Sequence, residues 1–234
     1  MARAPRLSLS GELHYVVQRG HNDQRVFADD HDHAAYLNML REAALQYGVA
    51  VHAYVLMTSQ VHLLATPAAP DALSRLMQSL GRRYVAEFNR RHGRSGTLWS
   101  GRFRAALIEG EGHGLEALVY LESMPTRAGL AQSDADWPWS SAAHHLGRRR
   151  DPLISEHSSF WTLGNTPFER ELVHADNLRH GLSGETVDAF NSVVLRGGVH
   201  GTPSFVTHVE SLSGLKVRAN PRGRPPSVQM QILK

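Results

Sequence analysis

The stretch VAVHAYVLMTSQVHLLAT, residues 49–66, contains two apolar runs that decide the fold. The runs 49–57 and 61–66 are rich in β-branched residues and are separated by three polar residues, a pattern that predicts a β-hairpin. A β-rich run at 12–18 comes before this hairpin, and residues 103–108 are a candidate for a fourth strand. Four strands of this kind are enough for an antiparallel sheet with a buried face.

Segments with the helical spacing of apolar residues lie on both sides of the hairpin. Residues 29–47 end before Gly48, and residues 70–92 end before Gly93. A third helix is expected over 114–123. The order strand, helix, strand, strand, helix, strand predicts an α+β fold with a ferredoxin-like (RRM-like) antiparallel sheet. We expect helices on one face of this sheet, and the other face free to form a site.

The chain after residue 130 has a different texture. Residues 131–180 hold three of the four tryptophans and few periodic segments, so we expect an irregular strap or linker after a first domain of residues 1–130. Residues 181–234 predict a small helical C-terminal extension with a basic tail, and its short helices are expected over 183–196 and 202–212.

The composition excludes several classes of protein. Because the chain has no cysteine, it has no disulfide framework, no thiolate zinc site and no cysteine nucleophile. It contains no run of 18 apolar residues, and its first ten residues have no apolar core, so we expect a cytoplasmic protein without a membrane segment. No period of 20 to 50 residues repeats, which excludes a solenoid.

The basic side chains are concentrated in one stretch. Residues 75–104 contain eight arginines against one acid, Glu87, with Phe88, Trp99 and Phe103 between them. Arginines match phosphates and aromatic rings stack on unpaired bases, so this stretch predicts nucleic-acid binding; the alternative is a solvated helix face above core aromatics. The candidate DNA-binding residues are Arg19, Arg82, Arg83, Arg90, Arg91, Arg94, Trp99, Arg102 and Arg104.

The tail contains a second basic segment. Residues 216–226 hold four bases and no acid. Within them, the run from Arg222 to Pro225 is similar to an AT-hook core, which lies extended in a narrow minor groove. The alternative is a flexible counter-charge. Arg222 and Arg224 are therefore further candidate DNA-binding residues.

Two places have residues that suit catalysis. Gln60 and His62 leave the same face of a strand, since side chains alternate, and such a pair can place two ligands on one divalent ion. The alternative for His62 is a satisfied interior histidine. Tyr120 shares a helix face with Glu116 and Met124 at a spacing of four residues, and by spacing alone it is a core residue.

Five ordered motifs are similar to those of a known family. They lie at 1–27, 51–67, 82–105, 119–130 and 136–141. In order and spacing they resemble the REP-associated tyrosine transposases of the single-tyrosine HUH superfamily, with an insertion-sequence-200-like domain. The resemblance implies a ferredoxin-like catalytic domain that binds single-stranded, hairpin-forming DNA, often as a homodimer. It also implies cleavage through a covalent 5′-phosphotyrosine with a divalent metal, and an association with the nucleoid.

The resemblance assigns roles to residues of this chain. The nucleophile falls on Tyr120, the histidine-hydrophobic-histidine motif on Gln60-Val61-His62, and the third metal ligand on Met124. An amide oxygen at Gln60 still suits Mg²⁺ or Mn²⁺, whereas the thioether of Met124 is a poor match for a hard cation. The leading hypothesis is therefore a transposase that cleaves and rejoins hairpin DNA. The alternatives are a domesticated hairpin-binding protein with a weakened metal site and an RNA-binding module.

Overall fold

The predicted hairpin forms one edge of the sheet. In the computed structural model, which describes residues 7–217, β2 (Val49–Met57) and β3 (Gln60–Pro67) pair antiparallel, with Met57 opposite Gln60. The register shifts between Val51 and Ala53, which indicates a bulge near the start of the hairpin. The hairpin prediction is confirmed.

Three further strands complete the sheet, in the order β2-β3-β1-β4-β5. β1 (Leu13–Arg19) is central and pairs antiparallel with β3 and with β4 (Arg104–Ile108). β5 (Val199–His200) adds two residues parallel to β4 and was not predicted. The α+β prediction is confirmed, and the four strands and two helices from β1 to β4 follow the predicted order, with the short helix η1 (His21–Asp23) added after β1.

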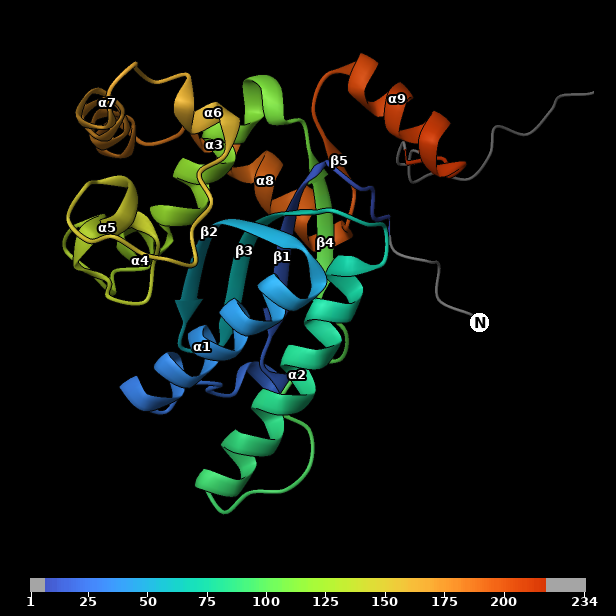
Figure 1. The fold of residues 1–234 in the computed structure, drawn as a ribbon, viewed down its shortest axis with the longest axis vertical. Helices are drawn as coiled ribbons and strands as arrows, with labels where there is room; N and C mark the ends of the chain where they lie inside the picture. The colour runs from blue at the N-terminus through green and yellow to red at the C-terminus, as the bar shows by residue number, and fades with distance from the viewer. Residues whose placement is uncertain (1–6, 218–234) are drawn as a thin grey trace, which may run out of the picture.

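The two helices between these strands cover one face of the sheet. α1 (Asp30–Tyr47) and α2 (Ala72–Arg91) lie in front of the strands in Figure 1. The side chain of Asp29 accepts a hydrogen bond from the backbone N–H of Asp32 and caps α1, and Gly48 ends the helix in the left-handed conformation. Both helices pack on a continuous apolar core.

The other face of the sheet is also covered, so the expectation of a free face was wrong. α3 (Gly110–Glu122) and α8 (Gly184–Arg196) pack on it and form a second apolar core with β1 to β4 (Figure 1). The reason lies in β1, which is buried at six successive positions rather than at alternate ones. A strand that is apolar on both faces must be covered on both.

The segment after α3 is a mixture of short helices and extended backbone. Besides α8, its helical elements are α4 (Met124–Arg127), η2 (Asp134–Asp136), α5 (Ala142–His145), α6 (Ser158–Trp161), α7 (Pro167–His180) and α9 (Pro203–Ser213). One further short helix, η1, lies between β1 and α1. The expectation of an irregular strap fails for α7, a 14-residue helix with a capping box formed by Thr166 and Glu169. The division into domains 1–130, 131–180 and 181–234 stays a prediction.

The strap is tied to the edge strand β2. The backbone N–H of Leu56 donates to the carbonyl of Trp139, and that of Ser155 donates to the carbonyl of Val51. Glu122, fully buried at the end of α3, bonds to His145 of α5 at 2.7 Å and to His174 of α7 at 2.8 Å. Within the described residues, no helix is both long and apolar enough to cross a membrane.

Candidate active site around Tyr120

The structure brings the predicted nucleophile and the predicted ligand His62 to the same side of the sheet. The hydroxyl of Tyr15 on β1 lies 2.9 Å from Nδ1 of His62 on β3. The rings of Tyr15 and Tyr120 meet edge to face, with their centroids 5.7 Å apart. Tyr15 therefore joins His62 to Tyr120, a role that the sequence did not indicate.

His62 is buried and electrically neutral. Burial, together with the positive charges of Arg19 and Arg127, lowers the pKa of His62 to about 3. Nε2 of His62 is buried without a hydrogen-bond partner. Because a neutral imidazole has one lone pair, the proton on Nδ1 or Nε2 decides what this residue can bind.

Met124 is in a position to influence that proton. The Tyr15 hydroxyl also lies 3.9 Å from Sδ of Met124, with the geometry of a donor. A phenol has only one proton, so a Tyr15 that donates to Met124 accepts from Nδ1–H of His62. In that arrangement the lone pair of His62 is on Nε2, the atom without a partner. This is how a hydrogen bond at one ring nitrogen prepares the other for a metal.

Gln60 completes the set of predicted ligands. It begins β3, is half-buried, and lies opposite Arg19 of β1, on the same face as His62. Nε2 of His62 and the amide oxygen of Gln60 suit Mg²⁺ or Mn²⁺, whereas Met124 offers only a thioether. The residues present therefore fit a divalent ion with two ligands and fail to provide the third.

Tyr120 is covered by the C-terminal part of the chain. Only 2% of the residue is exposed. Its hydroxyl donates to Oδ1 of Asn191 at 2.6 Å, and its ring stacks on Phe190 with the centroids 4.9 Å apart. Both partners are in α8, and the sequence analysis gave them no role. Phe190 and Asn191 lie outside the five motifs, so no motif pointed to them.

Two guanidinium groups influence the ionisation of the Tyr120 hydroxyl. Burial raises the pKa of Tyr120, and the positive charges of Arg127 and Arg19 act in the opposite direction. Arg127 is exposed, donates to Oγ of Ser123, and holds its guanidinium carbon 4.7 Å from the centre of the Tyr120 ring. Nothing in the sequence singles out Arg127, although it lies in the motif at 119–130. An arginine fork at this place suits a phosphate.

The arginines of α2 lie on the opposite side of the sheet from Tyr120. Four of the basic residues predicted to bind DNA are bonded to protein side chains: Arg83 to Glu42, Arg90 to Glu87, Arg91 to Asp29 and Asp32, and Arg94 to Gln24. Arg82 and Arg102 are exposed. Within residues 82–104, the arginines that are bonded to protein side chains thus lie on α2 or just after it, whereas Arg104 lies apart from them.

Arg19 and Arg104 are at the Tyr120 end of the sheet. They leave the sheet on the face that α3 and α8 cover, near the ends of β1 and β4. Arg104 donates to the backbone carbonyl of Leu195 in α8. Of the predicted DNA-binding residues, the structure therefore places Arg19 and Arg104 on the face of the candidate site.

The aromatic residues of the basic stretch belong to the core. Trp99 is 6% exposed and packs edge-on against Tyr36 and beside Tyr84, so a base has no access to its ring. The prediction that Trp99 binds DNA by stacking is corrected on this ground, and Phe88 and Phe103 are likewise buried. Arg222 and Arg224 lie outside the described residues.

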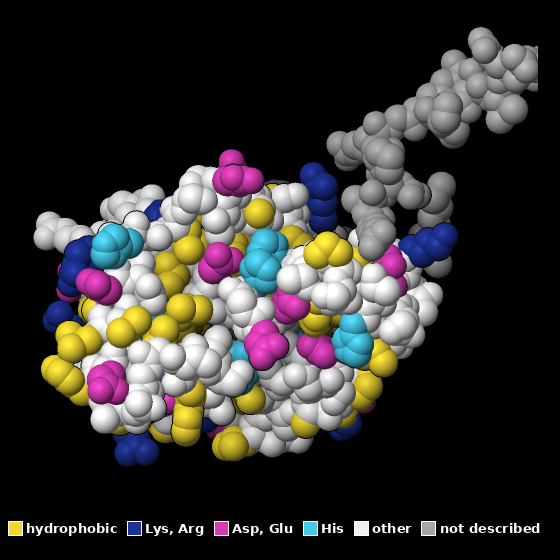
Figure 2. All heavy atoms as spheres, turned by 90° about the horizontal axis from the view of Figure 1, so that it is seen from above, with side chains coloured by type: hydrophobic (Ala, Val, Ile, Leu, Met, Phe, Trp, Pro, Cys, Tyr) yellow, Lys and Arg dark blue, Asp and Glu magenta, His cyan; other side chains and the backbone are white. Residues whose placement is uncertain are grey.

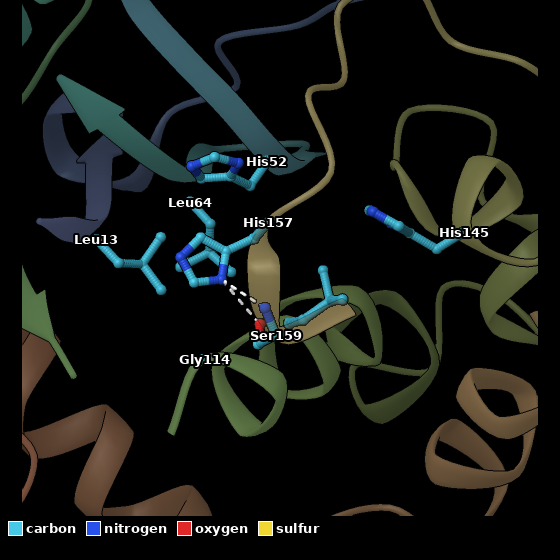
Figure 3. Close-up of a pocket in the computed structure, with 8 residues that line it drawn as sticks. Leu13, His52, Leu64, Gly114, His145, His157 and Ser159 are labelled. Atoms are coloured by element: carbon cyan, nitrogen blue, oxygen red, sulfur yellow. Dashed lines mark hydrogen bonds between the residues drawn. The ribbon is translucent and has the colours of Figure 1, made fainter. Parts of the chain in front are cut away.

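A small cavity lies on the same face of the sheet as Tyr120 but does not include it. Its lining contains His52 of β2, Leu64 of β3, and His157 and Ser159 from the α6 region. Figure 3 shows His52 and His157 together beside this cavity, with His157 bonded to Ser159. The cavity is separate from the predicted ligands Gln60 and His62, neither of which lines it.

Comparisons with known proteins agree with the motifs. Residues 10–123 match the family model described as "Transposase IS200 like". A solved structure of a REP-associated tyrosine transposase bound to a REP hairpin is similar at 18% identity, with 66% of this chain and 91% of that chain covered and a TM-score of 0.48. A candidate transposase of Deinococcus radiodurans R1 is similar at 22% identity, with 56% and 92% covered and a TM-score of 0.35. A search of curated proteins finds no match. Over residues 10–123, the chain therefore resembles the family of IS200-like transposases.

Proposed function

We propose that the chain cleaves and rejoins single-stranded, hairpin-forming DNA through Tyr120. The observation that supports this most is the grouping of Tyr120, Tyr15 and His62 at one end of the sheet, at the positions where the family resemblance expects a nucleophile and a ligand. The DNA would be chromosomal, so the expected place of action is the cytoplasm, at the nucleoid. A homodimer is expected from the same resemblance.

In the proposed reaction, the hydroxyl oxygen of Tyr120 attacks a phosphodiester. A bond forms between this oxygen and phosphorus, and the bond from phosphorus to the 3′ oxygen breaks. The phenolic proton is released to solvent, and the leaving 3′ oxygen takes up a proton from solvent. The products are a 5′-phosphotyrosine and a 3′-hydroxyl, and attack by that hydroxyl reverses the step and rejoins the strand. His62 and Gln60 would hold Mg²⁺ or Mn²⁺, which when bound polarises the phosphate.

Arginine side chains would assist this step. The guanidinium of Arg127 lies against the Tyr120 ring, and the charge of Arg19 acts on both Tyr120 and His62. Fixed positive charges stabilise the negative charge that develops on the phosphate oxygens. They also favour the phenolate of Tyr120, which is the stronger nucleophile.

The reaction requires a movement of α8. Because Tyr120 is 2% exposed and bonded to Asn191, a phosphate reaches its hydroxyl only after α8 moves away. The hydrogen bond from Tyr120 to Asn191 contributes about 1 kcal/mol, and the stack of Phe190 on the Tyr120 ring must also open. DNA that binds beside Arg19 and Arg104 is well placed to displace α8, since Arg104 is bonded to this helix.

The test is the formation of a covalent adduct. The full chain is incubated with a set of single-stranded DNA hairpins and Mn²⁺ or Mg²⁺, and a denaturing gel detects protein bound to DNA. The proposal expects an adduct that Tyr120→Phe abolishes and that the matched control Tyr47→Phe retains, since Tyr47 lies on α1 on the other side of the sheet. Failure of the wild-type chain to form an adduct with any hairpin contradicts the proposal.

A second function is favoured by Met124. Its sulfur lies beside Tyr15, where the resemblance expects the third metal ligand, and so weakens the metal site. On this ground the alternative is a protein that binds a DNA hairpin without cutting it. Hairpin binding without an adduct, followed by cleavage in the variant Gln60→His with Met124→Asn, supports this alternative. Equal affinity for RNA and DNA hairpins of one sequence supports an RNA-binding module instead.

A further inference from the structure

We propose that His113, Glu116 and His200 form a Zn²⁺ site that joins α3 to β5. Each residue offers one ligand atom, and these atoms lie within 4.8 Å of one another. His113 and Glu116 are one turn apart on α3, and His200 reaches them from the two-residue strand β5. Two imidazoles and one carboxylate are a set of donors that suits Zn²⁺.

The two histidines face each other across the proposed site. Their ring centroids are 4.8 Å apart, and Nδ1 of His113 lies 3.1 Å from a carboxylate oxygen of Glu116. All three residues are half-buried. The face that Figure 2 shows is the end of the molecule with the start of α3, where histidine and acidic side chains lie close together.

His200 supplies an independent observation. Its Nε2 atom is buried and has no hydrogen-bond partner. A buried polar atom without a partner costs free energy, and a metal ion is one group that removes this cost. The residue is also fixed in place, since its carbonyl accepts a hydrogen bond of 2.8 Å from the backbone N–H of Glu109.

A second carboxylate, that of Glu109, lies near His113. Oε2 of Glu109 lies 3.9 Å from Nε2 of His113 and accepts a hydrogen bond from the backbone N–H of Thr202, while Oε1 of Glu109 accepts one from the Thr202 hydroxyl. Metal-bound histidines commonly direct their second nitrogen at a carboxylate, which orients the ring. If Nδ1 of His113 binds the ion, the carboxylate of Glu109 is placed to orient the ring through Nε2.

The distances require a small adjustment. Ligand atoms around a tetrahedral zinc with bonds of about 2.1 Å lie roughly 3.4 Å apart. The present separation of up to 4.8 Å closes by side-chain rotation. Water is expected as the fourth ligand, because the structure places three protein groups here.

The location gives the ion a structural role. His113 and Glu116 belong to the segment that matches the transposase family, whereas His200 lies beyond it. The ring of His200 is 4.5 Å from that of Phe190, which stacks on Tyr120. An ion at this point therefore fastens the C-terminal extension, including α8, to the family domain.

The experiment measures metal binding by the full chain without an affinity tag. Isothermal titration with Zn²⁺ and the visible absorbance of Co²⁺ are recorded for the wild type, His200→Gln and the double variant His113→Gln with Glu116→Gln. Wild type is expected to bind one zinc ion per chain, with an affinity at least tenfold higher than that of either variant. The matched control His180→Gln, an exposed histidine of α7, is expected to bind as the wild type does.

Thermal unfolding separates loss of the site from loss of the fold. In EDTA, all four proteins are expected to unfold at similar temperatures, and added Zn²⁺ is expected to raise the midpoint for the wild type and His180→Gln only. Zinc binding that survives in both site variants overturns the proposal, as does a wild type that binds no zinc. Because the readout is metal binding, the result does not depend on DNA cleavage.

Discussion

Two pairs of buried tyrosines, one pair on each face of the sheet, differ in the partners of their hydroxyl groups. On the α1 and α2 face, Tyr36 and Tyr84 pack edge to face, and Tyr84 donates to the backbone carbonyl of Val26. On the opposite face, the hydroxyl of Tyr15 contacts His62, and that of Tyr120 contacts Asn191. The first pair contributes packing, whereas the second pair is bonded to side chains that can exchange a partner or a proton. This difference indicates where chemistry can occur.

The largest expected effect tests the buried charges on the Tyr120 side. Burial alone would raise the pKa of Glu122, but His145 and His174 more than offset this effect and lower the pKa below its usual range. Glu122→Gln is expected to lower the free energy of unfolding by about 3–5 kcal/mol, because it removes the buried carboxylate that is hydrogen-bonded to His145 and His174. Urea denaturation followed by circular dichroism measures this change.

The matched control is the exposed pair of Glu87 and Arg90 on α2. Glu87→Gln is expected to change the free energy of unfolding by less than about 1 kcal/mol. Equal effects of Glu87→Gln and Glu122→Gln would show that the two sides of the sheet do not differ in this respect.

The second effect concerns the arginines on the two sides. Arg127→Ala is expected to slow formation of the DNA adduct by about 10²-fold, or 2.7 kcal/mol, because it removes a charge beside the reacting phosphate. Arg83→Ala on α2 is expected to leave that rate nearly unchanged and to weaken DNA binding by no more than one phosphate contact. Single-turnover kinetics at saturating DNA distinguish the two, and equal slowing contradicts the assignment of Arg127.

The sequence predicted the sheet and its two long helices well, for a local reason. Apolar periodicity and helix-ending glycines such as Gly48 are properties of neighbouring residues, and so are the motifs around His62 and Tyr120. The roles of Tyr15, Asn191 and Phe190 depend on contacts between distant segments, which one sequence does not reveal. Trp99 was misassigned because an aromatic residue between arginines is equally consistent with stacking on a base and with packing in a core.

The third effect is a pH dependence of the free energy of unfolding that arises from His52 on the hairpin strand β2. Burial lowers the pKa of His52 to about 4, so the folded chain binds a proton there less readily than the unfolded chain does. This difference in pKa stabilises the folded chain relative to the unfolded chain. The stabilisation is complete above pH 6.5 and is lost as the pH falls toward 4. From pH 7 to pH 5 the loss is about 2 kcal/mol.

His52→Gln is expected to remove that part of the pH dependence, whereas His180→Gln, at an exposed position, is expected to retain it. Urea denaturation at pH 7 and pH 5 gives the comparison. The same slope in both variants would assign the acid sensitivity to other groups.

The smallest effect concerns the cover on Tyr120. Asn191→Ala is expected to reduce the free energy of unfolding by about 1 kcal/mol, because it removes one hydrogen bond. If α8 must move before cleavage, the same change accelerates adduct formation roughly fivefold. Slower adduct formation in this variant would show that Asn191 positions Tyr120 for the reaction rather than covers it.

The central claim is that Tyr120, and no other tyrosine, becomes linked to DNA, and peptide mapping tests this most directly. Trypsin cuts after Arg104 and Arg127, and the peptide 105–127 contains Tyr120 as its single tyrosine. After reaction with a DNA hairpin and nuclease digestion, mass spectrometry is expected to find a nucleotide on this peptide. A nucleotide on the peptide with Tyr15, or on any other peptide, would contradict the account.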